Sequence, residues 1–362
     1  MGGWSSTPAE PPDTEATDLP LLPAGVTVGT TLYGGAELPS PGTPERALLE
    51  EGVAGGLGGF TYYVDWVDLE PEPGVYTFET LTATLEGLEA LGVVPFVNLT
   101  VGDIEDWNLP PDLSDGDGGL APGVRLDDPE VLARFGALVE RVAPRVVERG
   151  GGLLGVGNEV DARLDGHPPE ELDSYVRFVE AARERVAAVE PELAVAVTLT
   201  KAAVQGRSRT WRELRRVTDV VAVNHAPILP DFFVLPEEEI VADLRETLDA
   251  YGSGPVVIQE LTCPSAVSMG ASEAWQAACF RLLLTELRSD PRVRFASIFT
   301  FQDFAEPTCT AVQEALMGDE LSELPHDVAE RLGDYFCELG LVAPDGTPKP
   351  AWDAVLDQAH GG

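Results

Sequence analysis

Residues 153–161 read LLGVGNEVD, an apolar run that closes on the pair Asn158 and Glu159. A stretch this continuously hydrophobic is typical of a strand buried on both faces in a parallel sheet. A carboxylate at the end of such a strand is costly to bury unless it has a partner or a role. The stretch therefore predicts a buried parallel strand that delivers Asn158 and Glu159 to a functional edge.

Similar apolar, β-branched runs recur on both sides of this one, and each is followed by a helix-like stretch. The eight predicted strands cover 25–32, 59–66, 93–100, 153–160, 194–200, 220–225, 255–261 and 295–301. The predicted helices are 81–91, 129–148, 169–189, 237–251 and 272–288. This alternation predicts an α/β protein of the closed (β/α)8 TIM barrel type. An open doubly wound sheet is the alternative, and the lack of a Gly-rich phosphate loop after the first strand argues against it.

The seventh run, PVVIQELTCPS (255–265), ends on Glu260 as the fourth ends on Glu159. Strands four and seven face one another across a barrel of eight, so both carboxyls are expected in one cleft at the C-terminal edge. The long connection 103–123, which carries Trp107, leaves from the same edge. The alternative is that each glutamate pairs with an arginine inside the barrel.

The chain has 62 acidic and 23 basic residues and a formal charge of -39, with only two lysines, Lys201 and Lys349. Nucleic acids need clustered Lys and Arg, so DNA and RNA are excluded as partners, and anionic membranes are not expected as partners either. The longest apolar runs fall far short of the roughly 20 residues of a membrane span. Two origins fit the charge: an extracellular or surface-tethered protein, or the cytoplasm of a salt-adapted organism.

Residues 1–24 hold five prolines, four acids and no base. Such a composition buries too little apolar surface to order the chain, so we expect a disordered linker there and a barrel domain over residues 25–362. Cys263, Cys279, Cys309 and Cys337 have no zinc-like spacing, and no metal or cofactor is expected. Cys263 and Cys309 follow neighbouring predicted strands and the other two lie on neighbouring helices, so two disulfides and four buried thiols both fit.

Together these motifs resemble clan A of the glycoside hydrolases, whose members carry an Asn-Glu pair after strand four and a Glu at the end of strand seven. The matching positions here are Asn158, Glu159 and Glu260. The segments WVDLEPEPGVYTF (66–78) and GLVAPDGTPKPAWDAV (340–355) are also similar to clan members. VGNEV (156–160) and ELTCPS (260–265) resemble the plant-type β-1,3-glucanases, with Cys263 where those have Trp.

The resemblance implies hydrolysis of a β-linked polysaccharide or oligosaccharide with retention of anomeric configuration. Glu260 would attack the anomeric carbon, Glu159 would act as acid and then base, and Asn158 would hold the sugar 2-hydroxyl. The two carboxyls would lie about 5 to 5.5 Å apart. The pKa of Glu159 should be raised by its setting, while hydrogen-bond donors keep Glu260 ionised.

Several other side chains are candidates for binding sugar, because aromatic rings can cover its apolar faces and carboxylates or amides can bind its hydroxyls. They are His225, Asn224, Trp66, Trp107, Phe301 and Asp65. Adjacent Tyr62 and Tyr63 cannot both face inward. For the aromatic residues core packing is the alternative, and for His225 a structural role.

Two departures from the clan pattern stand out. FASIFTFQDF (295–304) supplies Phe299 and Phe301 where clan members commonly have Trp, and strand two lacks the arginine that several families place under the nucleophile. Support for Glu260 would then come from His225, Gln259 or an arginine elsewhere. The competing function is a carbohydrate-binding barrel without turnover; a metal-dependent hydrolase would need clustered His and Asp. We expect a monomer with a carbohydrate partner.

Overall fold

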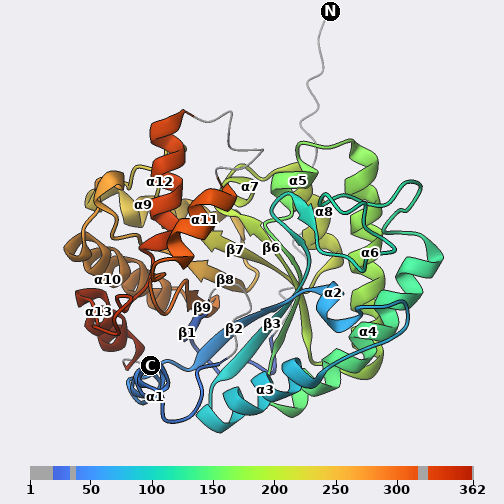
Figure 1. Ribbon diagram of the computed structural model, residues 1–362, viewed down its shortest axis with the longest axis horizontal. Helices are drawn as coiled ribbons and strands as arrows, with labels where there is room; N and C mark the ends of the chain where they lie inside the picture. Colours follow the sequence, from blue (N-terminus) through green and yellow to red (C-terminus); the bar gives the residue numbers. More distant parts are fainter. Residues whose placement is uncertain (1–18, 33–37, 317–324, 361–362) are drawn as a thin grey trace, which may run out of the picture.

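The computed structural model describes residues 19–32, 38–316 and 325–360 (Figure 1). Eight parallel strands form a closed sheet, because β1 pairs with both β2 and β9 and the circuit continues through β2 and β3. The predicted (β/α)8 barrel is therefore confirmed. Its strands are β1 (Thr27–Thr31), β2 (Gly59–Val64), β3 (Val94–Asp103), β5 (Leu153–Asn158), β6 (Ala194–Thr200), β7 (Val220–His225), β8 (Val256–Leu261) and β9 (Val293–Ile298).

The outer layer is helical. It consists of α1 (Pro44–Ala54), α2 (Trp66–Leu69), α3 (Glu79–Leu91), α4 (Pro129–Glu148), α5 (Asp161–Leu164), α6 (Pro169–Val189), α7 (Lys201–Gln205), α8 (Arg209–Val217), α9 (Glu237–Ala250), α10 (Glu273–Ser289), α11 (Thr308–Leu316), α12 (His326–Cys337) and α13 (Pro350–Ala359). Proline fits the first turn because its missing N–H would be unpaired there, and α4 and α6 begin on Pro129 and Pro169 at the positions that the sequence predicts. Within the described ranges, every helix is too short or too polar to span a bilayer.

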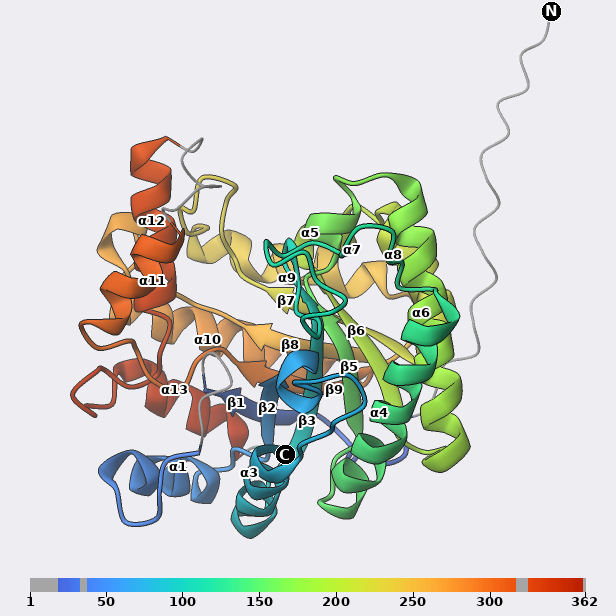
Figure 2. The same cartoon turned by 45° about the vertical axis from the view of Figure 1, so that its right-hand side comes forward.

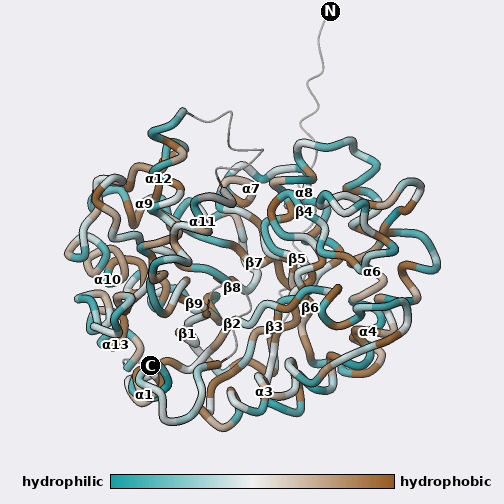
Figure 3. Tube along the Cα trace, viewed as in Figure 1, coloured by the Kyte–Doolittle hydropathy of each residue, from teal (hydrophilic) through white to brown (hydrophobic). Residues whose placement is uncertain are grey.

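The hydrophobic residues follow the barrel. In Figure 3 brown is most evident along barrel strands such as β5 and β6, whereas teal gathers on the outer turns of the helices. Predicted strand two included Trp66, but Trp66 instead begins α2 after β2 ends at Val64. A two-residue strand, β4 (Asp106–Trp107), pairs antiparallel with the end of β3 inside the connection expected to be a loop.

The chain enters the core earlier than the sequence suggested. Residues 1–18 of the predicted linker lie outside the described residues, but residues 19–24 are placed, and Leu19 and Leu22 are buried at 1% and 5% exposure. They join a cluster inside the barrel that includes Phe96 and Phe295. Arg294 Nη2 donates to the carbonyls of Leu19 and Leu22 at 3.1 and 3.0 Å. Two leucines that precede the predicted linker boundary at residue 24 thus close an apolar end of the barrel.

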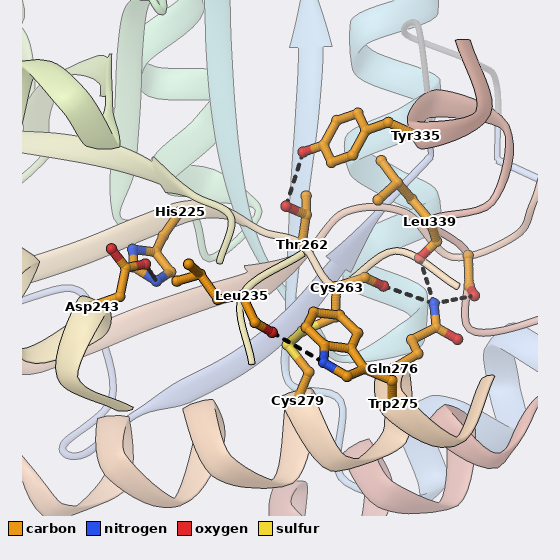
Figure 4. Close-up of a disulfide and its surroundings, with 11 residues drawn as sticks. His225, Leu235, Asp243, Thr262, Cys263, Trp275, Gln276, Cys279, Tyr335 and Leu339 are labelled. Atoms are coloured by element: carbon orange, nitrogen blue, oxygen red, sulfur yellow. Dashed lines mark hydrogen bonds and ion pairs between the residues drawn. A yellow bond between two sulfur atoms is a disulfide. The ribbon is translucent and has the colours of Figure 1, made fainter. Parts of the chain in front are cut away.

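Two disulfides lie in the last third of the chain, and hydrogen bonds from α10 hold the segment that follows β9. Disulfides join Cys263 to Cys279 and Cys309 to Cys337, so the disulfide alternative holds. The first links the end of β8 to α10 (Figure 4) and the second links α11 to α12, which lie beside one another in Figure 2. Gln276 Nε2 on α10 donates to the carbonyls of Cys263 and Leu339.

Both lysines of the chain lie in ion pairs behind the C-terminal edge of the barrel. Lys201 Nζ contacts Asp243 Oδ2 at 3.0 Å, and Lys349 Nζ contacts Asp303 Oδ2 at 2.5 Å. The Lys349 side chain is 4% exposed and also donates to Ser265 Oγ. This second pair fixes the C-terminal segment to the loops after β8 and β9.

Candidate active site

The two glutamates lie at the C-terminal edge of the barrel, on strands β5 and β8, which are separated in the sheet by β6 and β7. Glu159 follows β5 directly, and Glu260 is the penultimate residue of β8. The backbone that leads to Glu159 has unusual dihedral angles. Gly157 has φ 107° and Glu159 itself has φ 46°, and residues with a Cβ rarely adopt positive φ. A Cβ on Gly157 would stand 2.5 Å from Tyr175 Oη. Glycine at 157 therefore allows the strand to turn and present Glu159.

An amide network connects the strand ends. Asn224 Nδ2 donates to Asn158 Oδ1 at 3.0 Å and to Glu159 Oε1 at 3.1 Å. Gln259 Nε2 donates to the same Asn158 Oδ1 at 2.7 Å. Asn158 Nδ2 in turn donates to Asp103 Oδ1 at 3.0 Å. Asn158 and Asn224, both predicted from the sequence, thus lie beside Glu159 in one buried constellation.

Tyr63 takes the supporting position under Glu260. Its hydroxyl donates to Glu260 Oε1 at 2.5 Å, and Gln259 Nε2 donates to that hydroxyl at 3.3 Å. Tyr63 lies on β2, the strand that lacks the clan arginine. The sequence left three possible supports for Glu260: His225, Gln259 or an arginine. Gln259 contacts the amide network, whereas no arginine in the described part of the chain forms a hydrogen bond or ion pair with Glu260.

A register shift explains how adjacent residues of β8 reach one network. Between β7 and β8, Val223 pairs with Ile258 but Asn224 pairs with Glu260, which leaves Gln259 as the extra residue. A β-bulge of this kind re-aims side chains at a strand end. Gln259 is further held by donors from Asn98 and Thr198, each at 2.6 Å.

Burial and mutual repulsion shape the electrostatics of the pair. Burial, followed by the charge of Asp161, raises the pKa of Glu159 to about 7. Burial and the charge of Glu159 also raise the pKa of Glu260, although Tyr63 and Asn224 lower it. The expectation that donors keep Glu260 ionised is therefore incomplete, because burial outweighs them. Two carboxyls that repel one another do not ionise together, so the pair retains a proton near neutral pH.

Two further carboxyls border the pair. Asp103, at the end of β3, has a pKa raised by burial, and its charge acts on Glu159, Glu260 and Tyr63. Asp65, predicted as a binding residue, lies just before α2, accepts from Asn108 Nδ2 at 3.1 Å, and has a pKa raised to about 6 chiefly by burial. Asp103 was not singled out from the sequence, because an acidic residue in an acidic loop gives no distinguishing signal.

His225 lies outside the constellation. Its ring is fully buried, with Nδ1 3.2 Å from Thr247 Oγ1 and Nε2 3.5 Å from Asp243 Oδ2, and Figure 4 shows it directed at Asp243. Burial lowers its pKa to about 3, so the ring is neutral. Successive strand residues point to opposite sides, and Asn224 already takes the inner side. The prediction of a sugar contact at His225 is therefore wrong, and its structural alternative holds.

The predicted aromatic platforms are part of the core. Trp66 is fully buried, packs on Phe135 and donates through Nε1 to Glu70. Trp107 is 3% exposed and donates to Glu171, while Phe301 is 1% exposed and packs edge-on against Trp352. None of these rings is available to stack on a ligand, so those three predictions are wrong.

One aromatic residue that the sequence did not indicate is close to the glutamates. Tyr335 on α12 shares a hydrogen bond of 2.9 Å with Thr262 Oγ1, two residues after Glu260 (Figure 4). Burial raises the pKa of Tyr335, and the charges of Glu260 and Glu159 add to the rise. Helix α12 follows the barrel in sequence, so only the folded chain places it at this edge.

The constellation provides carboxyls and amides but no metal cage. The described residues contain no group of three or more His, Cys, Asp and Glu side chains placed to hold a metal ion. A groove of about 320 Å³ between α3 and α4, lined by Leu85, Arg145 and Arg149, lies on the outside of the barrel and away from the glutamates. Chemically, the site offers two buried carboxyls whose pKa values are raised, with amide side chains beside them that can bind polar groups.

Comparison with known proteins identifies related folds. No family model matches the chain, and no curated protein matches it in sequence. An exo-β-1,4-mannosidase, Op5Man5, from an Opitutaceae bacterium (strain TAV5) is similar with a TM-score of 0.65 and 18% identity over 92% of this chain; the match spans 59% of that longer protein. GH5_18 from Streptomyces cattleya, solved with GlcNAc, gives a TM-score of 0.67, 16% identity and coverage of 93% and 80%. A β-glycosidase, BGL167, gives 0.60, 16%, and coverage of 94% and 97%. At these identities the likeness confirms the barrel fold.

Proposed function

We propose that the chain is a retaining glycoside hydrolase of clan A that cleaves β-glycosidic bonds with Glu159 and Glu260. The observation that carries the proposal is that both carboxyls are buried at one edge of the barrel and influence one another. Asn224 lies at both of them: it donates a hydrogen bond to Glu159 and lowers the pKa of Glu260. Two carboxyls of opposite protonation are the equipment that glycoside hydrolysis needs. The fold likeness to several glycosidases supports the same assignment.

The reaction proceeds in two displacements. A carboxylate oxygen of Glu260 bonds to the anomeric carbon while the glycosidic C–O bond breaks, and the proton of Glu159 passes to the departing oxygen. Water then attacks the anomeric carbon, gives its proton to Glu159, and releases Glu260 as a carboxylate. Asn158 forms a hydrogen bond with the substituent at C2 of the sugar.

The contacts of the site favour this division of roles. A hydrogen bond to a carboxylate stabilises its charged form, and Glu260 receives one from Tyr63. Glu159 lies near the charge of Asp161, which favours retention of the proton. The proposed mechanism accordingly takes Glu260 as the carboxylate that attacks and Glu159 as the proton donor.

The test is the release of reducing sugar from a panel of β-glucans, mannans, xylans and galactans at low and high salt. We expect wild-type release and its loss in Glu260→Ala, while Glu180→Ala, an exposed change on α6, leaves it intact. Proton NMR of the first product should show the β-anomer before mutarotation. Glycan binding without hydrolysis in every case would instead assign a carbohydrate-binding barrel.

We also propose an extracellular or surface-tethered location. Disulfides persist in oxidising compartments, and the chain has two. Cell fractionation with an antibody against the barrel tests this location. Recovery in the cytoplasm of a salt-adapted host, with reduced cysteines, would contradict it.

A further inference from the structure

Glu260 lies on a part of β8 whose pairing is irregular on both sides. Against β7, Gln259 is the extra residue of a bulge. Against β9, the pairing passes from Ile258 to Leu261 while β9 advances by one residue fewer, so a second register shift falls at the same place. The extra residue of a bulge has no partner in the ladder. The position of Glu260 therefore depends on what holds the chain directly after it.

Thr262, the first residue after β8, is the point where this end of the strand is held. Its backbone N–H donates to the carbonyl of His225 at 3.1 Å, so the chain is still paired with β7 there. Side chains two residues apart in an extended chain point to the same side, which places the Thr262 hydroxyl on the side of Glu260. That hydroxyl is buried and shares a hydrogen bond of 2.9 Å with Tyr335 Oη (Figure 4).

Helix α12 holds Tyr335 in place through contacts made by neighbouring residues. The disulfide between Cys309 and Cys337 joins this helix to α11. Asp334 Oδ2 accepts from Ser268 Oγ at 2.6 Å. Two further hydrogen bonds join the helix and the residue after it to the loops that follow β7 and β8: Arg331 Nε to Asp231 O at 2.7 Å, and Ser265 N–H to Glu338 O at 2.9 Å.

The ring of Tyr335 is fixed as well. It packs edge-on against Phe232, with ring centroids 6.0 Å apart. The hydroxyl therefore has a defined position, and α12 has enough other contacts to stay attached without it. What the hydroxyl adds is a contact with the end of β8, two residues from Glu260.

We propose that Tyr335 is a positioning residue, which fixes the carboxyl of Glu260 for attack on the sugar by holding Thr262. This inference rests on the proposed function. Through Thr262, the hydroxyl of Tyr335 limits movement of the irregular segment and so keeps Glu260 at its donor Tyr63. Precise placement matters for a nucleophile, because the reacting atoms have to lie about 3 to 3.5 Å apart and a displacement of about 1 Å can lower a rate about a hundredfold.

The test is a double-mutant cycle on the two hydroxyls. Tyr335→Phe and Thr262→Val each remove one partner and keep the size of the side chain, and the double variant removes both. Ser268→Ala is the matched control, because it removes another hydrogen bond of α12. The pH profile of kcat/KM is measured for each protein on the glycan of the panel that wild type hydrolyses fastest, together with its melting temperature.

We expect kcat/KM to fall about two- to tenfold in each single variant, the range of one hydrogen bond. The double variant should lose no more than a single one, because the two hydroxyls act as a unit. The acid limb of the profile should move to higher pH, since a displaced Glu260 loses part of the hydrogen bond from Tyr63 that lowers its pKa. Ser268→Ala should keep both the rate and the acid limb.

Three results would overturn the positioning role and leave the proposed function standing. They are a wild-type rate in Tyr335→Phe, losses that add in the double variant, and an acid limb that stays in place. A loss in Ser268→Ala equal to that in Tyr335→Phe would also overturn it, because attachment of α12 would then be the cause. If wild type hydrolyses no glycan, the proposed function and this inference fail together. If Tyr335→Phe does not fold, Thr262→Val decides against the same control.

Discussion

At the scale of single residues, the two glutamates differ in the donors that reach them. Glu260 accepts from Tyr63 on β2, whereas Glu159 accepts from Asn224 on β7. Burial raises the pKa of both carboxyls, and hydrogen bonds lower it in part, from Asn224 at Glu159 and from Tyr63 and Asn224 at Glu260. In the proposed mechanism, Tyr63 and Asn224 would therefore influence the nucleophile and the acid without taking part in bond breaking.

Replacement of Tyr63 by Phe should lower kcat/KM about ten- to hundredfold. The loss of its hydrogen bond raises the pKa of Glu260, so the acid limb of the pH profile of kcat/KM should move to higher pH. Tyr251→Phe is the matched control, because that buried hydroxyl donates to Val221 O at 2.9 Å outside the site. An acid limb that stays in place in Tyr63→Phe would contradict the role of Tyr63.

Replacement of Glu159 by Gln should stabilise the protein at alkaline pH. The folded-state pKa of about 7 lies above the ordinary value of 4.5, so folding favours the protonated form. The stability that wild type has below pH 4.5 is lost as pH rises through about 7, whereas Gln cannot ionise. We expect the variant to melt several degrees higher than wild type at about pH 8 and at a similar temperature near pH 4.

The control for this prediction is Glu180→Gln, at an exposed position on α6. Its melting temperature relative to wild type should not change with pH in this way. Differential scanning calorimetry across the pH range measures both variants. A stabilisation by Glu159→Gln that is equal at all pH values would show that the charge of Glu159 is not the cause.

The sequence predicted the parts of the site that follow from strand ends, namely Asn158, Glu159, Asn224 and Glu260. It did not predict which side of a strand each candidate faces. Successive side chains of a strand point to opposite faces, which separates Tyr62 from Tyr63 and likewise Asn224 from His225. Applying this rule to the strand at 220–225 would have excluded His225 from the site. Tyr63 gave no signal as a partner of Glu260, because that contact joins residues 197 positions apart.

At the scale of elements, hydrophobic patterning located all eight barrel strands because each is buried on both faces. The predicted strand ends at the C-terminal edge were less accurate. Strand β3 ends at Asp103 rather than at residue 100, and β5 ends at Asn158, so Glu159 and Val160 lie in the turn that follows it. These ends carry register shifts, and a bulge depends on pairing with the next strand rather than on local sequence. The same irregularities that limit prediction re-aim the site residues.

The segment 19–24 gives a prediction at this scale. Leu22→Ala should reduce the free energy of unfolding by about 2 to 5 kcal/mol, because it opens a cavity in the cluster with Phe96 and Phe295. Leu21→Ala, in the same segment but partly exposed, should cost clearly less. Urea denaturation measures both. Equal, small losses would mean that the segment does not contribute to the core.

At the scale of the whole molecule, the charges are strongly unequal. With 62 acidic and 23 basic residues, most carboxylates have no cationic partner. Arg183, Arg185 and Arg245 illustrate how the available arginines are used, since each binds a carboxylate from another segment of the chain. The remaining negative charges repel one another across the folded surface.

Thermal stability should therefore rise with salt. We expect the melting temperature to increase as NaCl is raised from about 0.1 M to about 1 M, because the screening length falls from roughly 10 Å to roughly 3 Å. The rise should shrink at about pH 4, where many carboxyls are protonated. A melting temperature that does not depend on salt at neutral pH would contradict repulsion as a destabilising force.

The two ion-paired lysines have a practical consequence for handling the molecule. Lys201 and Lys349 are its only lysines, and both amines are held by aspartates, one of them almost wholly enclosed. Acylating dyes, glutaraldehyde and amine-coupled sensor chips attach to accessible amines, whereas the side chains of Lys201 and Lys349 are only 18% and 4% exposed. Immobilisation or fluorescent labelling of the native protein should instead be directed to the many carboxylates on its surface.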